Sequence, residues 1–335
     1  MLVANARKTA RRVVDGAQYL GFRMASVCGR GPLRGHRRLR VDEVVWQDGQ
    51  RFVAEIAGGE VFSDYGVILK DRKLISDLSP IMGSGRLEQH EALWLSDLGR
   101  SSYIAGRVAV ISSHAHQRYY HWLFDILPRI EILRQSGLQF DRLIANSQMA
   151  YQRETLTALG IADVSNPQPH FRIVAEKLLV PSLPGPLGVP SPFAIRFLRD
   201  AFGLTAKPVR KLYVARGDAL TRRVTNEARI INALPGFEVV LLDGMSVIEQ
   251  ARLFAEAAIV IGPHGAGLSN IVFMQPGGRV IEFMPETYFN DCFEVIAVNL
   301  GLDYRRISST SLGPPNHDIV VDIAKLKQPE SIEEI

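Results

Sequence analysis

The sequence predicts an α/β protein with two domains, the first of which begins with a β-rich portion. Apolar, β-branched segments alternate with helical segments from about residue 105 to residue 285, as in sheets with helices on their faces. The length of 335 residues suits two domains. Residues 181–192 hold five prolines and two glycines, and such a stretch sustains neither a helix nor a central strand. We therefore expect domains at 1–190 and 191–335.

The first 40 residues carry much of the positive charge. They hold ten basic side chains and one acid, whereas the whole chain has a formal net charge of +4. Residues 1–20 also space apolar side chains as a helix does. A basic amphipathic helix is typical of a segment on an anionic membrane surface, but an ordinary surface helix has the same pattern. Because the basic residues do not cover one folded face, we expect no nucleic-acid partner.

Composition excludes several classes of protein. A hydrophobic fraction of 47% is too high for a disordered chain. Two cysteines, Cys28 and Cys292, form neither a disulfide framework nor a zinc cluster, and favour a reducing compartment. The sequence has neither a run of about 18 apolar residues nor the pattern of a secretory signal. We expect a cytoplasmic protein, peripheral on the inner face of the membrane through residues 1–40.

The first domain combines a β-rich part, residues 40–100, with an α/β part, residues 105–180. The spacing of apolar residues predicts a helix over Tyr119–Leu133, kinked at Pro128. In chain order, we expect strands at Glu43–Trp46, Phe52–Ile56, Val67–Leu69, Val108–Ile111, Leu143–Ala145 and Ile173–Val180.

The second domain alternates strands and helices more regularly. Predicted strands are Lys211–Ala215, Phe237–Leu242, Ala258–Ile261 and Arg279–Phe283, and predicted helices are Asn226–Leu234, Ser246–Ala257 and a short one from Leu268. Ser246 and Glu249 have the spacing of a capping box at a helix start. The alternation predicts a parallel, Rossmann-like sheet. Two such domains would face each other across a cleft.

The loop after strand Ala258–Ile261 is the strongest candidate site. It reads Gly262-Pro-His-Gly-Ala-Gly267 and opens a helix at the carboxyl edge of the sheet, where such folds bind ligands. Gly265 and Gly267 allow a close approach of the backbone to an anion at the helix start, and His264 can donate to a phosphate. The third glycine of a dinucleotide fingerprint is absent, which weakens a nicotinamide site. Tight strand-to-helix packing alone also explains glycines here.

Two further groups carry charge near predicted strand ends. Arg216 follows a strand, and Arg222 and Arg223 precede a helix, so the three can reach one sheet-edge crevice and bind phosphate oxygens. A solvated charge run is the alternative. Glu282 lies inside an apolar strand, where it would accept hydrogen bonds from a ribose diol or close an ion pair at the strand end.

His121 and Asp125 are the candidate catalytic pair. They are four residues apart, so they share one helix face. Such a pair can act as a general base with an orienting carboxylate. Spacing alone equally allows both side chains to satisfy buried backbone groups.

Four ordered blocks of the sequence resemble glycosyltransferase family 61, of the bacterial capsular or exopolysaccharide type. They are Arg118-Tyr-Tyr-His-Trp-Leu-Phe-Asp-Ile-Leu-Pro-Arg129, Lys211-Leu-Tyr-Val-Ala-Arg216 with Arg222-Arg-Val-Thr-Asn-Glu227, Gly262-Pro-His-Gly-Ala-Gly-Leu-Ser-Asn270, and Phe273-Met-Gln-Pro-Gly-Gly-Arg-Val-Ile-Glu282. The resemblance covers roughly residues 105–300. Arg118 is a departure, because many members have asparagine there.

The resemblance implies a GT-B-like inverting glycosyltransferase that moves a sugar from a nucleotide sugar, such as a UDP-sugar, to a glycan or lipid-linked acceptor in surface polysaccharide synthesis. It requires no cofactor or metal, and the C-terminal half shows no D-x-D pair. Our candidate base for this transfer is His121, with Asp125 orienting it or serving instead. The implied donor-binding residues are Arg216, Arg222, Arg223, Asn226, His264, Gly265, Ala266, Gly267, Asn270 and Glu282. The alternatives are a nicotinamide-dependent oxidoreductase and a catalytically inactive, membrane-docked assembly protein of the same fold.

Overall fold

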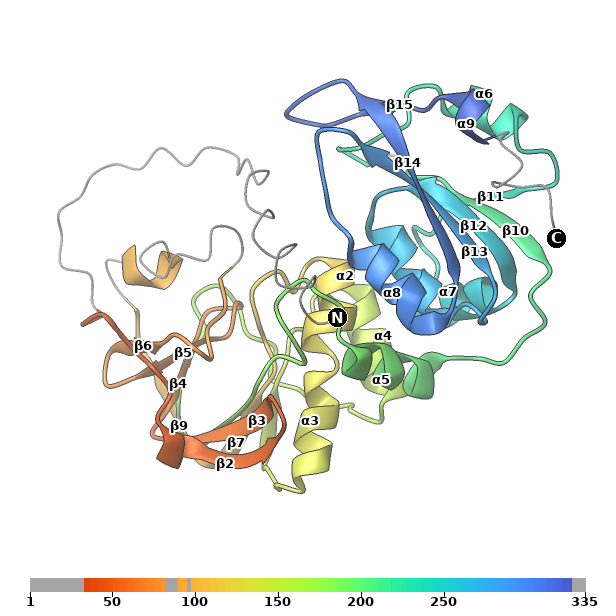
Figure 1. Cartoon of the computed structure of the whole chain (residues 1–335). Coiled ribbons are helices and arrows are strands. Elements are labelled where there is room, and N and C mark those ends of the chain that lie inside the picture. Colours follow the sequence, from red (N-terminus) through yellow and green to blue (C-terminus); the bar gives the residue numbers. More distant parts are fainter. Residues whose placement is uncertain (1–32, 82–89, 95–97, 218, 327–335) are drawn as a thin grey trace, which may run out of the picture. The chain divides into compact units, whose positions relative to one another are not determined.

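A computed structural model describes residues 33–81, 90–94, 98–217 and 219–326 (Figure 1). The chain divides between Phe197 and Leu198 into two compact units. We call the described residues 33–197 the N-terminal unit and residues 198–326 the C-terminal unit. The division falls inside helix α5, Pro192–Phe202, slightly beyond the domain boundary expected after residue 190. The helix predicted for residues 1–20 lies outside the described residues.

The N-terminal unit is built on one nine-stranded sheet among its described residues. Its strands are β1 (His36–Arg37), β2 (Val44–Asp48), β3 (Arg51–Ala57), β4 (Glu60–Phe62), β5 (Val67–Lys70), β6 (Lys73–Ile75), β7 (Ser102–Val110), β8 (Arg142–Ile144) and β9 (Arg172–Pro181). The main path runs β1-β6-β5-β4-β9-β3-β2, and β7 joins it by pairing with β9 and β8.

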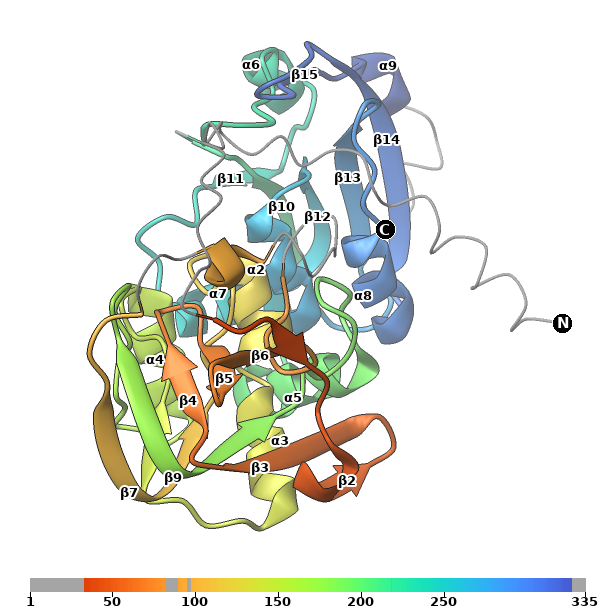
Figure 2. The same ribbon diagram turned by 90° about the vertical axis from the view of Figure 1, so that its left-hand side faces the viewer.

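The sheet corrects the predicted division of this unit into a β-rich part and a Rossmann-like part. Strand β9 is ten residues long and pairs antiparallel with both β4 and β3 on one side, and parallel with β7 on the other (Figure 2). Both parts therefore share one mixed sheet. Its parallel α/β portion is limited to β8, β7 and β9. The expected pairing of two such domains across a cleft stays a prediction.

The helix predicted over Tyr119–Leu133 is interrupted where a proline was expected to kink it. The chain forms α2 (Tyr119–His121), a π-helical turn η4 (Trp122–Ile126) and α3 (Arg129–Ser136). The Leu127 N–H donates to the Trp122 carbonyl at 2.8 Å, five residues back. A wider turn suits the residues before Pro128, whose ring clashes with the carbonyl four residues earlier in a regular α-helix.

The remaining short elements of this unit are η1 (Val41–Glu43), η3 (Glu91–Trp94) and α4 (Ala150–Ala158). Sequence patterns did not predict α4. The core lies on the sheet, where β7 contributes Val108 and Val110 and β9 contributes Leu178 and Val180, all fully buried. Buried parallel strands are apolar on both faces, and this explains the clear signal of β7 and β9 in the sequence.

The C-terminal unit contains the predicted parallel sheet. Its strands are β10 (Arg210–Val214), β11 (Glu238–Val240), β12 (Ala257–Pro263), β13 (Arg279–Pro285), β14 (Asp303–Ser311) and β15 (Ile319–Val320). They follow the order β11-β10-β12-β13-β14-β15, and all neighbours are parallel except β14 and β15. The four strands predicted here are confirmed as β10, β11, β12 and β13. Every residue of β12 is buried. The sequence patterns did not predict β14 and β15.

Helices α6 (Glu227–Asn232), α7 (Val247–Ala255), η5 (Ala266–Phe273), α8 (Cys292–Leu300) and α9 (Ile323–Leu326) complete this unit. The predicted capping box is confirmed. The Ser246 hydroxyl accepts from the Glu249 N–H at 3.2 Å, and the Glu249 carboxylate accepts from the Ser246 N–H at 2.7 Å. The helix predicted from Leu268 is a 3₁₀ helix that begins two residues earlier. Within the described part of the chain, no helix has the length and apolar character needed to cross a bilayer.

Candidate functional site

The candidate site of the C-terminal unit lies where β10 and β12 end. These strands are parallel neighbours, so their carboxyl ends lie at the same edge of the sheet. Arg216 follows β10 by two residues, and His264 follows β12 directly. The His264 N–H donates to the Phe283 carbonyl of β13 at 2.9 Å, which ties the loop to the next strand. The sheet thereby fixes the position of the His264 backbone.

Two guanidinium groups converge on the backbone carbonyl of His264. Nη1 of Arg216 donates to it at 2.8 Å, and Nε of Arg222 donates at 3.1 Å. A single neutral acceptor cannot compensate two cations. Burial lowers the pKa of Arg216 to about 10, and the charge of Arg222 acts in the same direction. The carboxylates of Asp318 and Asp243 act in the opposite direction, and Asp318 is paired with Arg223. Two converging guanidinium groups suit an anionic ligand with several oxygens.

Gly265 makes room for Arg216. A Cβ atom at residue 265 would lie 1.6 Å from Nη1 of Arg216, so with any other residue here the guanidinium has to shift from its present position. Its φ of 176° is ordinary extended backbone. Gly267 is packed differently, because a Cβ there would lie 3.1 Å from Cδ1 of Leu242 and 3.2 Å from Cγ1 of Val214. Ala266, the first residue of η5, is exposed.

The carboxylate of Glu282 has partners within the sheet, and its predicted ribose contact stays a prediction. This residue of β13 is fully buried. Its Oε1 lies against Nδ1 of His264, and its Oε2 accepts from the hydroxyl of Tyr304 on β14. Both oxygens are therefore engaged inside the sheet, which matches the ion-pair alternative at this strand. Burial lowers the pKa of His264, while the hydrogen bond with Glu282 opposes that effect.

Three of the predicted donor-binding residues have partners within the unit. Arg223 forms an ion pair with Asp318, with Nη2 and Oδ2 2.7 Å apart. The Asn226 amide accepts from the Val321 N–H at 3.0 Å and donates to its carbonyl at 2.8 Å. The buried Asn270 amide donates to Oε1 of Gln250 at 2.7 Å. Only Arg216 and Arg222 of the three predicted arginines meet at His264.

Asn226 therefore ties the start of α6 to the segment after β15, Asn270 ties η5 to α7, and Arg223 ties the loop before α6 to the segment before β15. Each of these three side chains therefore has a structural role that does not require a bound ligand. The sequence could not separate such contacts from donor binding, because β15 was not predicted.

His121 and Asp125 of the N-terminal unit form the predicted pair. Nδ1 of His121 lies 2.6 Å from Oδ2 of Asp125, whose side chain is 1% exposed. The Gly188 N–H also donates to Asp125, to Oδ1 at 3.1 Å and to Oδ2 at 3.3 Å. Burial raises the pKa of Asp125, against the lowering effect of His121. The carboxylate is thus held between an imidazole and a backbone amide.

The proline-rich loop packs on this pair. The Gly188 carbonyl accepts from the Tyr120 hydroxyl at 2.9 Å, and a Cβ at Gly188 would lie 3.6 Å from Cε1 of His121. Gly188 has a φ of +77°, a conformation that favours glycine. The sequence indicated only a linker or a long loop at residues 181–192.

Further histidines near His121 were not singled out from the sequence. His114 and His116 follow β7, and burial lowers the pKa of His114 to about 4, with the charges of Arg118 and the neighbouring histidines adding to the effect. His116 is fully buried, with Nε2 3.3 Å from Oδ2 of Asp64. Their place after a predicted strand end, at Ser112-Ser-His-Ala-His116, is the signal that could have found them. No group of three or more His, Cys, Asp or Glu suited to a metal occurs among the residues that the structure describes.

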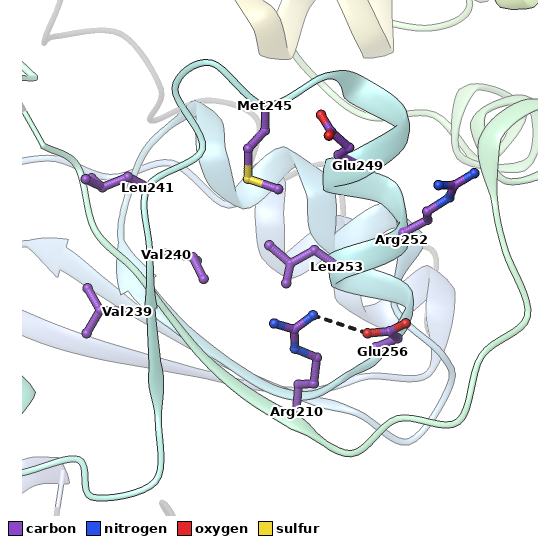
Figure 3. A pocket seen from close by; sticks show the side chains of 9 residues that line it. All are labelled: Arg210, Val239, Val240, Leu241, Met245, Glu249, Arg252, Leu253 and Glu256. Carbon is purple, nitrogen blue, oxygen red and sulfur yellow. Dashed lines mark hydrogen bonds and ion pairs between the residues drawn. The ribbon is translucent and has the colours of Figure 1, made fainter.

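An open pocket of about 460 Å³ lies elsewhere in the C-terminal unit (Figure 3). It is bounded by the side chains of Arg210, Val239, Val240, Leu241, Met245, Glu249, Arg252, Leu253 and Glu256. Arg210 at the start of β10 forms an ion pair with Glu256 there, at 3.2 Å. None of the predicted site residues lines this pocket.

Together these features define an α/β protein with two arginines that converge at a sheet edge in one unit and a histidine–carboxylate pair in the other. Residues 119–281 match the model of the family described as Glycosyltransferase 61. This match supports the resemblance that the sequence blocks carry. The matched segment includes His121, Asp125, Arg216, Arg222 and His264, and it ends one residue before Glu282.

Two plant proteins are similar to part of the chain. One is Beta-1,2-xylosyltransferase RCN11 of Oryza sativa subsp. japonica, 29% identical over 123 residues, covering 31% of this chain and 23% of that protein. The other is Beta-1,2-xylosyltransferase of Arabidopsis thaliana, 39% identical over 64 residues, covering 19% of this chain and 12% of that protein. The chain thus aligns with less than a quarter of the length of either relative.

Proposed function

We propose that this protein is an inverting glycosyltransferase that uses a nucleotide sugar, such as a UDP-sugar, as donor. The observation that carries the proposal is the convergence of Arg216 and Arg222 on the His264 carbonyl, at 2.8 and 3.1 Å, inside the family-matched segment. A nucleotide sugar presents a diphosphate, whose oxygens suit arginine forks. The leaving diphosphate gains negative charge during transfer, so fixed positive groups at its site stabilise the transition state.

We assign the donor diphosphate to the C-terminal unit, to Arg216, Arg222 and the start of η5 at Ala266. The exposed first residue of η5 offers backbone N–H groups to an anion, in addition to the two guanidinium groups. Burial of Arg216 strengthens its interaction with an anion, because water competes less for the charge. Arginines and backbone donors supply the positive charge that a divalent metal provides in other transferases, so the proposal includes no metal.

We assign the general base to His121 in the N-terminal unit. Its Nδ1 is occupied by Asp125 at 2.6 Å, so Nε2 is the atom that can take a proton. The acceptor hydroxyl oxygen forms a bond to the anomeric carbon while the bond from that carbon to the diphosphate breaks. The hydroxyl proton passes to Nε2, and the nucleoside diphosphate leaves with the bonding electrons. A single displacement of this kind inverts the anomeric configuration.

We propose the donor sugar and the acceptor as chemical classes. Both relatives carry the name β-1,2-xylosyltransferase, which favours a pentose donor over a hexose. We propose a glycan or lipid-linked acceptor in surface polysaccharide synthesis, and a cytoplasmic, membrane-peripheral location through the basic residues 1–40. Screening UDP-xylose against other nucleotide sugars by thermal shift would identify the donor, since a bound ligand raises the midpoint of unfolding by mass action.

The direct test is isothermal titration calorimetry with UDP, GDP, CDP and ADP. We expect one of them to bind, and Arg216→Ala to weaken its affinity by at least about tenfold, because a hydrogen bond to a charged group contributes about 1.5–3 kcal/mol. The matched control is Arg279→Ala, whose side chain pairs with Asp303 at 2.6 Å at the opposite end of β13. Equal loss in both variants, or no binding of any of the four nucleotides to the unaltered protein, would refute the proposal.

A further inference from the structure

The imidazole of His264 is held from one side by two residues of the neighbouring strands. Nδ1 lies against Oε1 of Glu282 on β13, and the Tyr304 hydroxyl on β14 donates to the other oxygen of the same carboxylate. Glu282 is fully buried, and the side chain of His264 is 6% exposed. A buried carboxylate is stable only where donors satisfy its oxygens. His264 and Tyr304 provide them.

This arrangement fixes which nitrogen of His264 carries a proton. A carboxylate accepts hydrogen bonds, so the neutral ring holds its proton on Nδ1. Burial and the neighbouring Glu282 raise the pKa of Tyr304, which keeps its hydroxyl protonated as a donor. Nε2 is consequently the ring atom that can address a ligand. The backbone carbonyl of the same residue holds the guanidinium groups of Arg216 and Arg222.

We propose that Glu282 and Tyr304 are positioning residues that present Nε2 of His264 to the anion bound by Arg216 and Arg222, and that His264 takes up a proton when this anion binds. The proposal rests on the proposed function and deepens it. The proton comes from solvent, joins the lone pair of Nε2, and forms an N–H that donates to a diphosphate oxygen. The negative charge of Glu282 stabilises the resulting imidazolium.

The charged groups around His264 explain why protonation follows ligand binding. In the free protein, burial and the charges of Arg216 and Arg222 lower the pKa of His264, and Glu282 acts against them. The aromatic rings of Tyr288 and Phe293 lie 5.2 and 5.1 Å from the imidazole and contribute no formal charge. On β14, Arg306 is paired with Glu294 at 2.9 Å. A bound diphosphate neutralises the effect of the two arginines and brings its own negative charge next to the imidazole, and both changes raise the pKa of His264.

The test is calorimetric titration with whichever of UDP, GDP, CDP and ADP binds most tightly, in two buffers of different ionisation enthalpy, between pH 7 and pH 9. Phosphate groups lose their last proton near pH 6, and the pKa of Arg216 is lowered only to about 10, so neither titrates strongly in this range. We expect proton uptake at pH 7 and an affinity that falls by up to about tenfold per pH unit between the pKa of His264 in the free protein and its higher pKa in the complex.

Two variants separate this role from a merely structural one. Glu282→Gln keeps the shape but removes the charge, so we expect a loss of affinity at pH 7, no proton uptake and a flat pH profile. Tyr304→Phe leaves Oε2 of Glu282 without this donor, so we expect a weaker affinity at pH 7 than in the unaltered protein. The matched control is Tyr213→Phe, because Tyr213 also donates a buried hydroxyl to a carboxylate, Glu227, at 2.9 Å. Its profile should equal that of the unaltered protein.

The outcomes are distinguishable. If none of the four nucleotides binds the unaltered protein, the proposed function fails and the inference with it. If one binds without proton uptake, or Glu282→Gln leaves both the affinity and the uptake unchanged, only the inference is overturned. Nitrogen-15 chemical shifts of His264 in the unaltered protein provide a readout that is independent of variant folding. A neutral ring with its proton on Nε2 contradicts the proposal.

Discussion

At the scale of residues, one position combines several roles. His264 offers its carbonyl to Arg216 and Arg222, its Nδ1 to Glu282 and its N–H to the Phe283 carbonyl. Sequence reasoning identified the histidine and both arginines, because they follow recognisable strands. It left a ribose contact and an ion pair as alternatives for Glu282, and it did not find Tyr304. A carboxylate in an apolar strand looks the same in sequence whether it faces a ligand or a buried histidine.

The spatial requirement at Gly265 gives a prediction at this scale. In Gly265→Ala the new Cβ would lie 1.6 Å from Nη1 of Arg216, so the guanidinium must leave the His264 carbonyl. We expect the affinity for the nucleoside diphosphate to fall by at least about tenfold, as when a charge-assisted hydrogen bond is lost. Calorimetry measures the affinity, and a thermal melt checks that the variant folds. A folded variant of unchanged affinity would show that Arg216 is not needed in this position.

At the scale of elements, the clearest sequence signals belonged to buried parallel strands. The strands β7, β9, β10, β12 and β13 were predicted from their buried apolar residues, such as Val108 and Val110 in β7 and Leu178 and Val180 in β9. The strand β14 was missed, since residues 303–311 alternate Asp, Arg, Ser and Thr with few apolar residues and only Ile307 and Ser309 are buried. The π-helical turn at Trp122–Ile126 was also missed. Its hydrogen-bond pattern depends on Pro128 and on packing, which apolar periodicity does not encode.

Arg129, the first residue of α3, holds this helix to the sheet. Its guanidinium, at the start of α3, donates to the carbonyls of Pro181, Ile111 and Ser112. It is buried, and burial lowers its pKa to about 9. Because Arg129→Met leaves buried carbonyls without donors, we expect the free energy of unfolding to fall by about 3 kcal/mol.

Urea denaturation measures this change. The control is Arg134→Met on the same helix, an exposed side chain with one hydrogen bond to the Leu159 carbonyl at 2.6 Å, where we expect a loss of less than about 1 kcal/mol. Equal effects of the two substitutions would mean that the contacts of Arg129 do not hold α3 to the ends of β7 and β9.

At the scale of the whole molecule, the sequence predicted two α/β halves, and the structure contains two compact units. The parallel sheet of the C-terminal unit was predictable because local alternation determines its connections. The mixed sheet of the N-terminal unit was not. Its pairing depends on β9, at residues 172–181, bridging strands that lie more than a hundred residues earlier in the chain. Short apolar segments do not indicate such distant partners.

Buried histidines in both units predict how stability depends on pH. Burial lowers the pKa values of His90, His114 and His264 below the ordinary value of 6.5, that of His114 to about 4. The unfolded chain therefore binds more protons than the folded one between these values and pH 6.5. Stability is complete above about pH 6.5 and is lost as the pH falls toward 4.

Urea denaturation between pH 4.5 and pH 7.5 tests this expectation. His114→Gln should make the dependence of the unfolding free energy on pH shallower. His36→Gln, a substitution of an exposed histidine on β1, should leave the dependence unchanged. If the unfolding free energy of the His114 variant depends on pH as steeply as that of the unaltered protein, this imidazole titrates alike in the folded and unfolded states.

The position of Glu282 and Tyr304 beyond residue 281 has a practical consequence for recombination between relatives. A chimera that exchanges residues 119–281, the family-matched segment, takes His264 from one parent and its carboxylate and tyrosine partners from the other. Such hybrids would fold around a mismatched hydrogen-bond triad whenever the parents differ at those two strands. A crossover after β14, beyond Ser311, takes His264, Glu282 and Tyr304 from the same parent. We recommend this crossover site for exchanging donor specificity.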